Sequence, residues 1–203
     1  PAPVPTKLPH IALYWENTVA PHPERAPWSD ALIGFIDARF SHLDKATDID
    51  KFCPNYRQLD HLQKLTALAS IFVWTAYYES SFDPTDSSVD VGTAGDHNTY
   101  SEGLLSMSQV DIANYGIPDM HYTWQDLLKP IPNLDLGVAV MAKQIDHVGT
   151  ILIGPGRNWL YWATLHPYGM YDQSKAIIYG VKKLPFCVNQ NAKKKTAPKK
   201  HAA

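Results

Sequence analysis

The architecture of this 203-residue chain follows from the stretch Thr75-Ala76-Tyr77-Tyr78-Glu79-Ser80-Ser81-Phe82-Asp83-Pro84. It ends an apolar segment that begins near Leu59 and places apolar residues at three- and four-residue steps, which predicts a long helix ending at Glu79. This helix is apolar on nearly all sides toward its end, as expected of a central core helix. A carboxylic acid at the polar end of a core helix has partly apolar surroundings, which favour its protonated form. Glu79 is therefore a candidate general acid, the alternative being a carboxylate that only bonds the helix end.

The segments on either side of this helix predict further helices. Residues 29–40 have helical spacing and Ser29 as a candidate N-cap, and further helices are predicted at 108–115, 123–129, 133–148, 157–165 and 172–184. The loop 83–100 is rich in Gly, Asp and Ser, so it favours turns or a short hairpin. We predict a mainly α domain over 27–190 with a short β-hairpin or irregular loop after the central helix. A surface arm (1–26) precedes it, and a flexible Lys-rich tail (191–203) follows it.

The composition predicts a globular protein, and the N-terminal end favours export. With 45% hydrophobic and 11% aromatic residues it can bury one full core, while the apolar run 65–78 is too short and too polar to span a membrane. The Pro-rich start without Met resembles a mature end left by signal-peptide removal, although a trimmed chain would look the same. In an exported protein Cys53 and Cys187 would form a disulfide; otherwise they are buried thiols. We expect a periplasmic or secreted monomer.

The net charge of −2 hides a strong segregation of charge. No Lys or Arg occurs between Lys64 and Lys129, and the acidic residues in that segment are Glu79, Asp83, Asp86, Asp90, Asp96, Glu102, Asp111, Asp119 and Asp126. Such a field repels nucleic acid and attracts cationic groups. The alternative is an acidic, solvated face. No His-Glu-x-x-His pair, Cys-x-x-Cys pair or Gly-x-Ser-x-Gly element is present, so the spacing indicates neither a metal site nor a serine hydrolase, and we expect no cofactor.

Three sequence blocks together carry a resemblance to a known family. They are Glu79-Ser80-Ser81-Phe82-Asp83-Pro84, then Gly103-Leu104-Leu105-Ser106, then Asn133 with Gly137 four positions later. Over roughly residues 60–170 the chain resembles the lysozyme-like superfamily, specifically soluble lytic transglycosylases and goose-type lysozymes. Ser106 stands where that family prefers Gln. The stretch 159–166 lacks the family's Ala-Tyr-Asn triplet, so we expect Tyr161 or Tyr168 to replace its Tyr beside the acid.

The resemblance implies cleavage of the β-1,4 bond between muramic acid and glucosamine in peptidoglycan, with Glu79 as the general acid. Hydrolysis with inversion also needs a second carboxylate to activate water, and goose-type enzymes take it from the loop after the acid. The candidates are Asp90, Asp96 and Glu102. The resemblance and the aromatic composition predict substrate contacts at Ser101, Gly103, Leu104, Ser106, Met107, Tyr100 and Tyr168.

The sequence is compatible with several related functions. Three acidic candidates in the right loop favour a muramidase over a lytic transglycosylase, in which the muramic 6-hydroxyl attacks and leaves an anhydro end. A chitosanase-type hydrolase and a non-catalytic wall-binding module also fit the same residues. Because glucosamine without its N-acetyl group is a cation, the acidic segment also predicts a preference for de-N-acetylated glycan.

Overall fold

The protein is mainly α-helical, as predicted. The computed structural model describes residues 8–89, 100–152 and 161–188, and two short strands follow the central helix in it. The α-helices are α1 (Ala26–Ala38), α2 (Phe40–Leu43), α3 (Ile49–Phe52), α4 (His61–Ser80), α5 (Asp111–Asn114), α6 (Trp124–Leu127), α7 (Pro130–Val148) and α8 (Ser174–Lys182). The 3-10 turns are η1 (Tyr14–Glu16), η2 (Pro23–Arg25), η3 (Tyr56–Gln58) and η5 (Ala163–Leu165). Strands β1 (Ser87–Val89) and β2 (Tyr100–Glu102) pair antiparallel, with Ser88 opposite Ser101.

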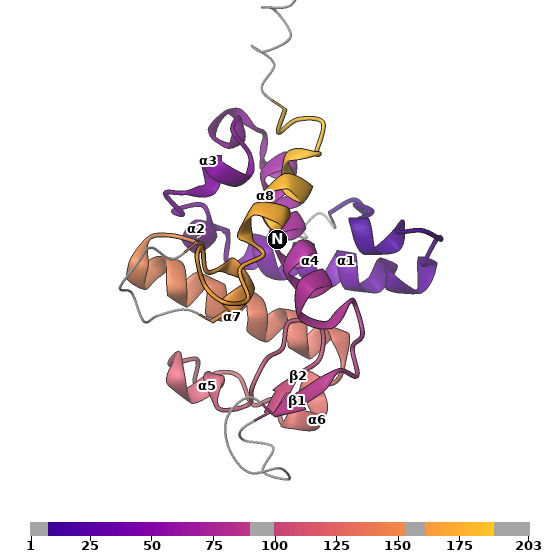
Figure 1. Cartoon of the computed structure of the whole chain (residues 1–203), viewed down its shortest axis with the longest axis vertical. Coiled ribbons are helices and arrows are strands. Elements are labelled where there is room, and N and C mark those ends of the chain that lie inside the picture. The colour runs from indigo at the N-terminus through magenta and orange to yellow at the C-terminus, as the bar shows by residue number, and fades with distance from the viewer. Residues whose placement is uncertain (1–7, 90–99, 153–160, 189–203) are drawn as a thin grey trace, which may run out of the picture.

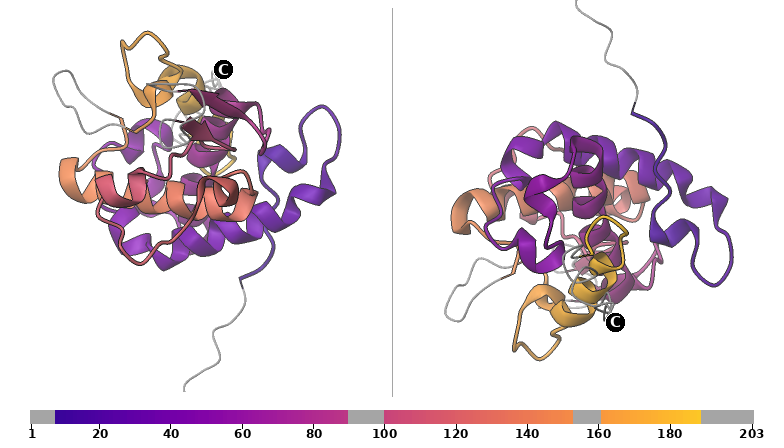
Figure 2. Two further views of the ribbon diagram at one scale, coloured as in Figure 1. Left: turned by 90° about the horizontal axis from the view of Figure 1, so that it is seen from below. Right: turned by 90° about the horizontal axis from the view of Figure 1, so that it is seen from above.

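Helix α4 runs through the middle of the molecule (Figure 1). It begins with a capping box, in which the Asp60 carboxylate accepts from the backbone N–H of Gln63 at 2.8 Å and the Gln63 side chain accepts from the N–H of Asp60. Helix α1 packs against both α4 and α7, while α8 packs against α4 from another side, as the two views of Figure 2 show. Most of the middle of α4 is buried by these neighbours, so the prediction of a central core helix is confirmed.

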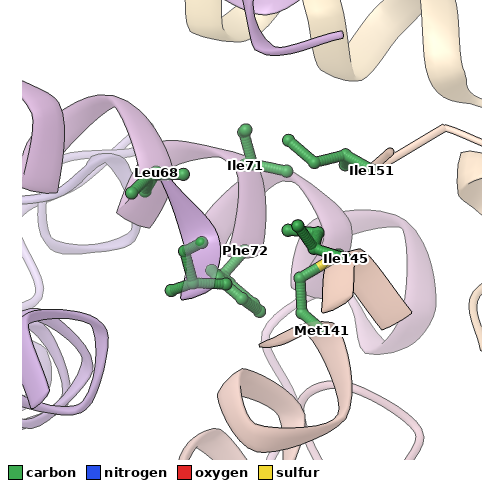
Figure 3. A pocket seen from close by; sticks show the side chains of 7 residues that line it. Leu68, Ile71, Phe72, Met141, Ile145 and Ile151 are labelled. Carbon is green, nitrogen blue, oxygen red and sulfur yellow. The ribbon is translucent and has the colours of Figure 1, made fainter. Parts of the chain in front are cut away.

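The side chains of α4 and α7 meet in a dry part of the core. Figure 3 shows Leu68, Ile71 and Phe72 facing Met141, Ile145 and Ile151 around a void of about 10 Å³. Every lining residue is apolar, so a water molecule there would find no hydrogen-bond partner. These side chains form an apolar part of the core between α4 and the end of α7.

The N-terminal segment contributes buried side chains to the core, among them Leu13 and Trp15. Trp15 is fully buried, and its indole N–H donates to the Ser29 hydroxyl at 2.7 Å. The prediction that Ser29 caps α1 is wrong, because the helix begins at Ala26 and Ser29 lies in its first turn. Pro27 explains the earlier start, since proline fits the first turn, where its missing N–H has no partner to lose.

A disulfide bond ties the C-terminal part of the described chain to the segment after α3. Cys53, which follows α3, is bonded to Cys187, which follows α8, across 134 positions of sequence. The predicted pairing of the two cysteines is therefore confirmed. Among the helices of residues 8–89, 100–152 and 161–188, none has the length and apolar character that crossing a membrane requires.

Candidate functional site

Glu79 lies in the last turn of α4, where the chain turns away abruptly. The helix ends at Ser80, and the next two residues, Ser81 and Phe82, both have left-handed backbones with φ of 54° and 67°. Such values cost energy in residues other than glycine, so the surrounding packing must hold them. Phe82 is buried edge-on against Trp15, with the Arg25 guanidinium 5.4 Å from its ring centre. The N-terminal segment therefore supports the turn that follows Glu79.

A threonine hydroxyl from late in the chain contacts the Glu79 carboxylate. Thr164 Oγ1 donates to Glu79 Oε1 at 2.6 Å, and Thr164 itself is only 6% exposed, whereas Glu79 is partly exposed. The Thr164 carbonyl accepts from the N–H of Gln173 at 2.9 Å, which closes the loop 165–172 at its base. Thr164 lies three positions after Tyr161, one of the two tyrosines predicted beside the acid; that placement of Tyr161 or Tyr168 stays a prediction.

The second sequence block forms a tight turn beside the end of α4. The backbones of Glu102 and Met107 exchange two hydrogen bonds of 2.9 Å, and Gly103 (φ +70°) and Ser106 (φ +50°) shape the turn between them. A Cβ atom at Gly103 would collide with the Leu127 carbonyl oxygen, so only glycine fits there. The Ser80 hydroxyl donates to the Leu104 carbonyl at 3.0 Å. The first and second blocks are thereby joined directly.

Asn133 and Gly137, the residues of the third block, hold the second block in place. The fully buried side chain of Asn133 accepts from the N–H of Leu105 at 2.9 Å and donates to the carbonyls of Glu102 and Leu127 at 2.6 and 2.9 Å. Gly137 leaves room for the Leu105 side chain, which a Cβ atom would strike. Three motifs that are far apart in the sequence thus form one structural unit.

The segment that carries Thr164 also clamps this turn. The Trp162 indole N–H donates to the Leu105 carbonyl at 2.8 Å. The Tyr161 hydroxyl lies 2.6 Å from an Asp111 carboxylate oxygen and 2.8 Å from the Ser106 carbonyl, and it accepts from the N–H of Ser108. Burial, followed by the nearby Asp111 charge, raises the pKa of Tyr161 well above its usual value, so this hydroxyl stays protonated. Residues 161–164 therefore connect Glu79 to the second block.

Three carboxylates gather at the base of the two strands. Burial raises the pKa of Asp86, and the charges of Asp83 and Glu102 raise it further. The Asp86 carbonyl accepts from the N–H of Gly103 at 2.7 Å, so this acidic group adjoins the second block. Hydrogen bonds from the side chain and backbone of Thr85 lower the pKa of Asp83. Among the acidic residues of the base-free segment, Asp83, Asp86 and Glu102 thus form a group next to the turn 102–107.

The structure describes most of the predicted site residues. Asp90 and Asp96 lie outside the described residues. Glu102 is fully buried, as are the backbone-turn residues Gly103, Leu104 and Met107; Ser101 is nearly so. Tyr100 and Ser106 are partly exposed, and Tyr168 is 88% exposed on the loop closed by Thr164. Their assignment to catalysis and substrate binding stays a prediction.

Sequence reasoning missed the roles of Thr164, Trp162 and Ser80. Ser80 lies inside the first block, and Trp162 lies inside the aromatic stretch that we expected near the acid. The sequence therefore indicated both positions, but it did not indicate which groups their side chains bond. In the described part of the chain, no three His, Cys, Asp or Glu side chains come together in a way that would hold a metal ion.

The fold resembles that of a protein of known structure. No protein-family model matches the sequence, and no curated protein matches it. A solved structure of DslA (Bd0314), a Bdellovibrio protein, matches with a TM-score of 0.72 and 24% identity, covering 89% of this chain and all of that one. The chain shares the fold of DslA. Two structures of DslA variants, each with one glutamate replaced by glutamine, match with TM-scores of 0.73 and 0.72 at 22% and 24% identity over the same shares of both chains.

Proposed function

We propose that the protein is a lysozyme-like glycosidase that cleaves the β-1,4 bond between N-acetylmuramic acid and N-acetylglucosamine, with Glu79 as the general acid. The observation that carries the proposal is the position of Glu79. Its carboxylate lies at the end of the core helix, partly exposed and bonded to Thr164, and the next residue, Ser80, bonds the turn 102–107. All three blocks of the lysozyme-like resemblance converge there, which is what a site built for one substrate requires.

The chemistry assigns one proton transfer to Glu79. The acid donates its proton to the glycosidic oxygen as the bond to the anomeric carbon breaks and positive charge develops on the sugar. The Thr164 hydroxyl, as donor to Oε1, orients the carboxyl group and stabilises the carboxylate that remains. In hydrolysis, a water molecule then adds to the anomeric carbon and gives its proton to a second carboxylate.

Asp90 is the first candidate for that second carboxylate. The two glutamates substituted in the DslA variants lie eleven positions apart, and Asp90 lies eleven positions after Glu79. This spacing favours hydrolysis over the transglycosylase alternative, which needs no such group. Mass spectrometry of the released fragments distinguishes the two, because hydrolysis leaves reducing ends and transglycosylation leaves anhydro ends.

The acidic group Asp83, Asp86 and Glu102 favours a cationic sugar. De-N-acetylated glucosamine carries an ammonium group near neutral pH, and the charges of Asp83 and Glu102 beside Asp86 create a negative potential that attracts it. We therefore propose a preference for de-N-acetylated peptidoglycan. Equal or faster release from acetylated sacculi than from chemically deacetylated sacculi would overturn this preference.

Substitution at Glu79 tests the proposed reaction. Glu79→Gln keeps the size and the hydrogen-bond capacity of the side chain but removes the acid, so lysis of deacetylated sacculi should fall at least ~100-fold. Glu24→Gln, an exposed carboxylate on η2, is the matched control and should keep full activity. Lysis by wild type that survives in Glu79→Gln rules out this acid, and wild type that binds sacculi without cutting any of them supports a wall-binding module. The disulfide fits export to an oxidising compartment, so we propose a periplasmic or secreted location.

A further inference from the structure

A cavity of about 260 Å³ lies beside α4, away from Glu79. It is bounded by the N-terminal segment around Tyr14, by α4 and by the end of α8. Its α4 residues, Thr66, Ser70 and Trp74, are four positions apart and so lie on one face of the helix. Glu79 is five positions beyond Trp74, which places it about 140° around the helix axis. The cavity is therefore separate from the candidate active site.

The apolar wall of the cavity is held by specific packing. The Trp74 ring stacks on Tyr14 with centroids 4.4 Å apart and an angle of 20° between the planes. Its other side lies against Gly180, where any Cβ atom would overlap the indole. Leu184 and Pro185 continue the wall beyond α8. This wall is preformed, because tertiary contacts fix the Trp74 ring before any ligand arrives.

The polar groups of the cavity specify what a ligand must carry. The Thr66 and Ser70 hydroxyls each donate to a carbonyl of their own helix at 2.8 Å, so their oxygens offer only lone pairs to the cavity. Lys183 is exposed at the rim, and its Nζ lies 4.6 Å from the Tyr179 ring centre. Among the described residues no carboxylate forms an ion pair with Lys183. A matching ligand thus has hydrogen-bond donors, a small apolar body and an anionic group.

We propose that this cavity binds the carboxylate end of a short peptide with small apolar side chains. The peptide N–H groups would donate to Thr66 and Ser70, the side-chain methyl groups would contact Trp74 and Leu184, and the terminal carboxylate would pair with Lys183. The volume is below the roughly 300 Å³ at which pockets for drug-sized ligands begin, so it suits two residues. The stem peptides of the cell wall end in D-alanine, and choosing them as the source rests on the proposed function.

Calorimetric titration of the full chain with D-alanyl-D-alanine tests this site. We expect saturable binding at millimolar concentration. Lys183→Gln should weaken it about fivefold, and Ser70→Leu, which fills the cavity, should abolish it. Lys182→Gln is the matched control, since Lys182, the last residue of α8, is an exposed neighbour of Lys183 that does not line the cavity; it should stay within about twofold of wild type. Circular dichroism establishes that each variant is folded, and Lys183→Gln keeps the test decisive if Ser70→Leu unfolds.

The outcomes separate this proposal from the one for Glu79. No saturation by about 10 mM, or an equal loss in Lys182→Gln and Lys183→Gln, overturns the peptide site. L-alanyl-L-alanine that binds as well as the D,D peptide overturns the wall source. D-alanyl-D-alanine has no glycosidic bond, so the titration measures binding independently of any cleavage. If the wild type binds the peptide but never cuts glycan, only the proposed glycosidase activity is contradicted. If it cuts glycan but does not bind the peptide, only the proposed peptide site is contradicted.

Discussion

The hydroxyl of Thr164 lies 2.6 Å from Oε1 of Glu79, across 85 positions of sequence, and donates a hydrogen bond to it. Thr164 belongs to the same segment as Tyr161 and Trp162, which bond the turn 102–107. One short segment therefore orients the candidate acid and fixes the neighbouring wall of the site. A substitution at Thr164 is expected to change the protonation of the candidate acid. A substitution that disturbs the turn 102–107 is expected to change the geometry around the acid.

Thr164→Val removes the hydroxyl while keeping the shape of the side chain. Because a donated hydrogen bond favours the ionised carboxylate, its loss should move the alkaline limb of the pH–rate profile to higher pH and lower the rate near the optimum roughly tenfold. The pH–rate profile on deacetylated sacculi measures both effects. Thr164→Ser keeps the donor and should resemble wild type. An unchanged profile in Thr164→Val would show that this hydrogen bond does not serve the reaction.

Asn133→Leu tests the support of the second block. It leaves the N–H of Leu105 and the carbonyls of Glu102 and Leu127 buried without their partner, so the free energy of unfolding should fall by roughly 2–4 kcal/mol. Urea denaturation followed by far-ultraviolet circular dichroism measures this. Asn114→Leu, at an exposed position on α5, is the control and should change stability by less than about 0.5 kcal/mol. A loss in Asn133→Leu no larger than the control's would contradict the structural role of the three hydrogen bonds.

The helices could be predicted because their signals are local. The three- and four-residue steps before Glu79 correspond to α4, and the helix predicted at 133–148 corresponds to α7, which starts three residues earlier at Pro130. The early start was missed because Pro130 and Pro132 look like helix breakers, although proline is tolerated in a first turn. The turn residues in the loop after α4 likewise predicted a short hairpin or irregular loop, and β1 and β2 lie there.

The contacts of the site could not be predicted in the same way. Thr164 lies in an aromatic stretch of which the described part forms one 3-10 turn, and no local pattern distinguishes its hydroxyl from that of Tyr161. The Ser80 bond to the Leu104 carbonyl and the pairing of Glu102 with Met107 depend on where a loop returns. Such distances are set by packing over long sequence separations. The sequence could therefore indicate the candidate acid and the blocks around it, while the hydrogen bonds that orient the acid required the structure.

Removing the disulfide should cost more stability than any single hydrogen bond. Cys53 and Cys187 close a loop of 134 positions, and bridges of that length restrict the unfolded chain strongly. The double variant Cys53→Ala with Cys187→Ala should lose about 2–5 kcal/mol of unfolding free energy. Urea denaturation with and without dithiothreitol measures it, because reductant should destabilise wild type and leave the double variant unchanged. Equal stability of the two proteins without reductant would contradict the prediction.

The anchoring of the N-terminal segment should depend on pH through His10. Its imidazole contacts the carboxylates of Asp30 at 2.6 Å and Glu16 at 3.1 Å, and Glu16 also bonds the Ser29 hydroxyl that holds Trp15. The hydrogen bond with Asp30 is the largest cause that raises the pKa of His10 above its ordinary value of 6.5. Since the folded state binds this proton more tightly, the stabilisation is fully present below pH 6.5 and is lost as the pH rises through the raised pKa.

Urea denaturation between about pH 6 and pH 8 should therefore show a decline of stability in wild type that is smaller in His10→Gln. Asp30→Asn removes the main cause of the shift and should reduce the decline in the same way. Proton exchange at the Trp15 indole N–H, followed by nuclear magnetic resonance, reports the same segment directly. Base-catalysed exchange quickens with pH in both proteins, so the expected result is a steeper rise above the His10 pKa in wild type than in His10→Gln. If wild type and His10→Gln lose stability with the same slope, His10 does not link the segment to pH. Because Trp15 packs on Phe82 in the turn that follows Glu79, a confirmed link would also make the geometry of the candidate acid sensitive to pH from outside the site.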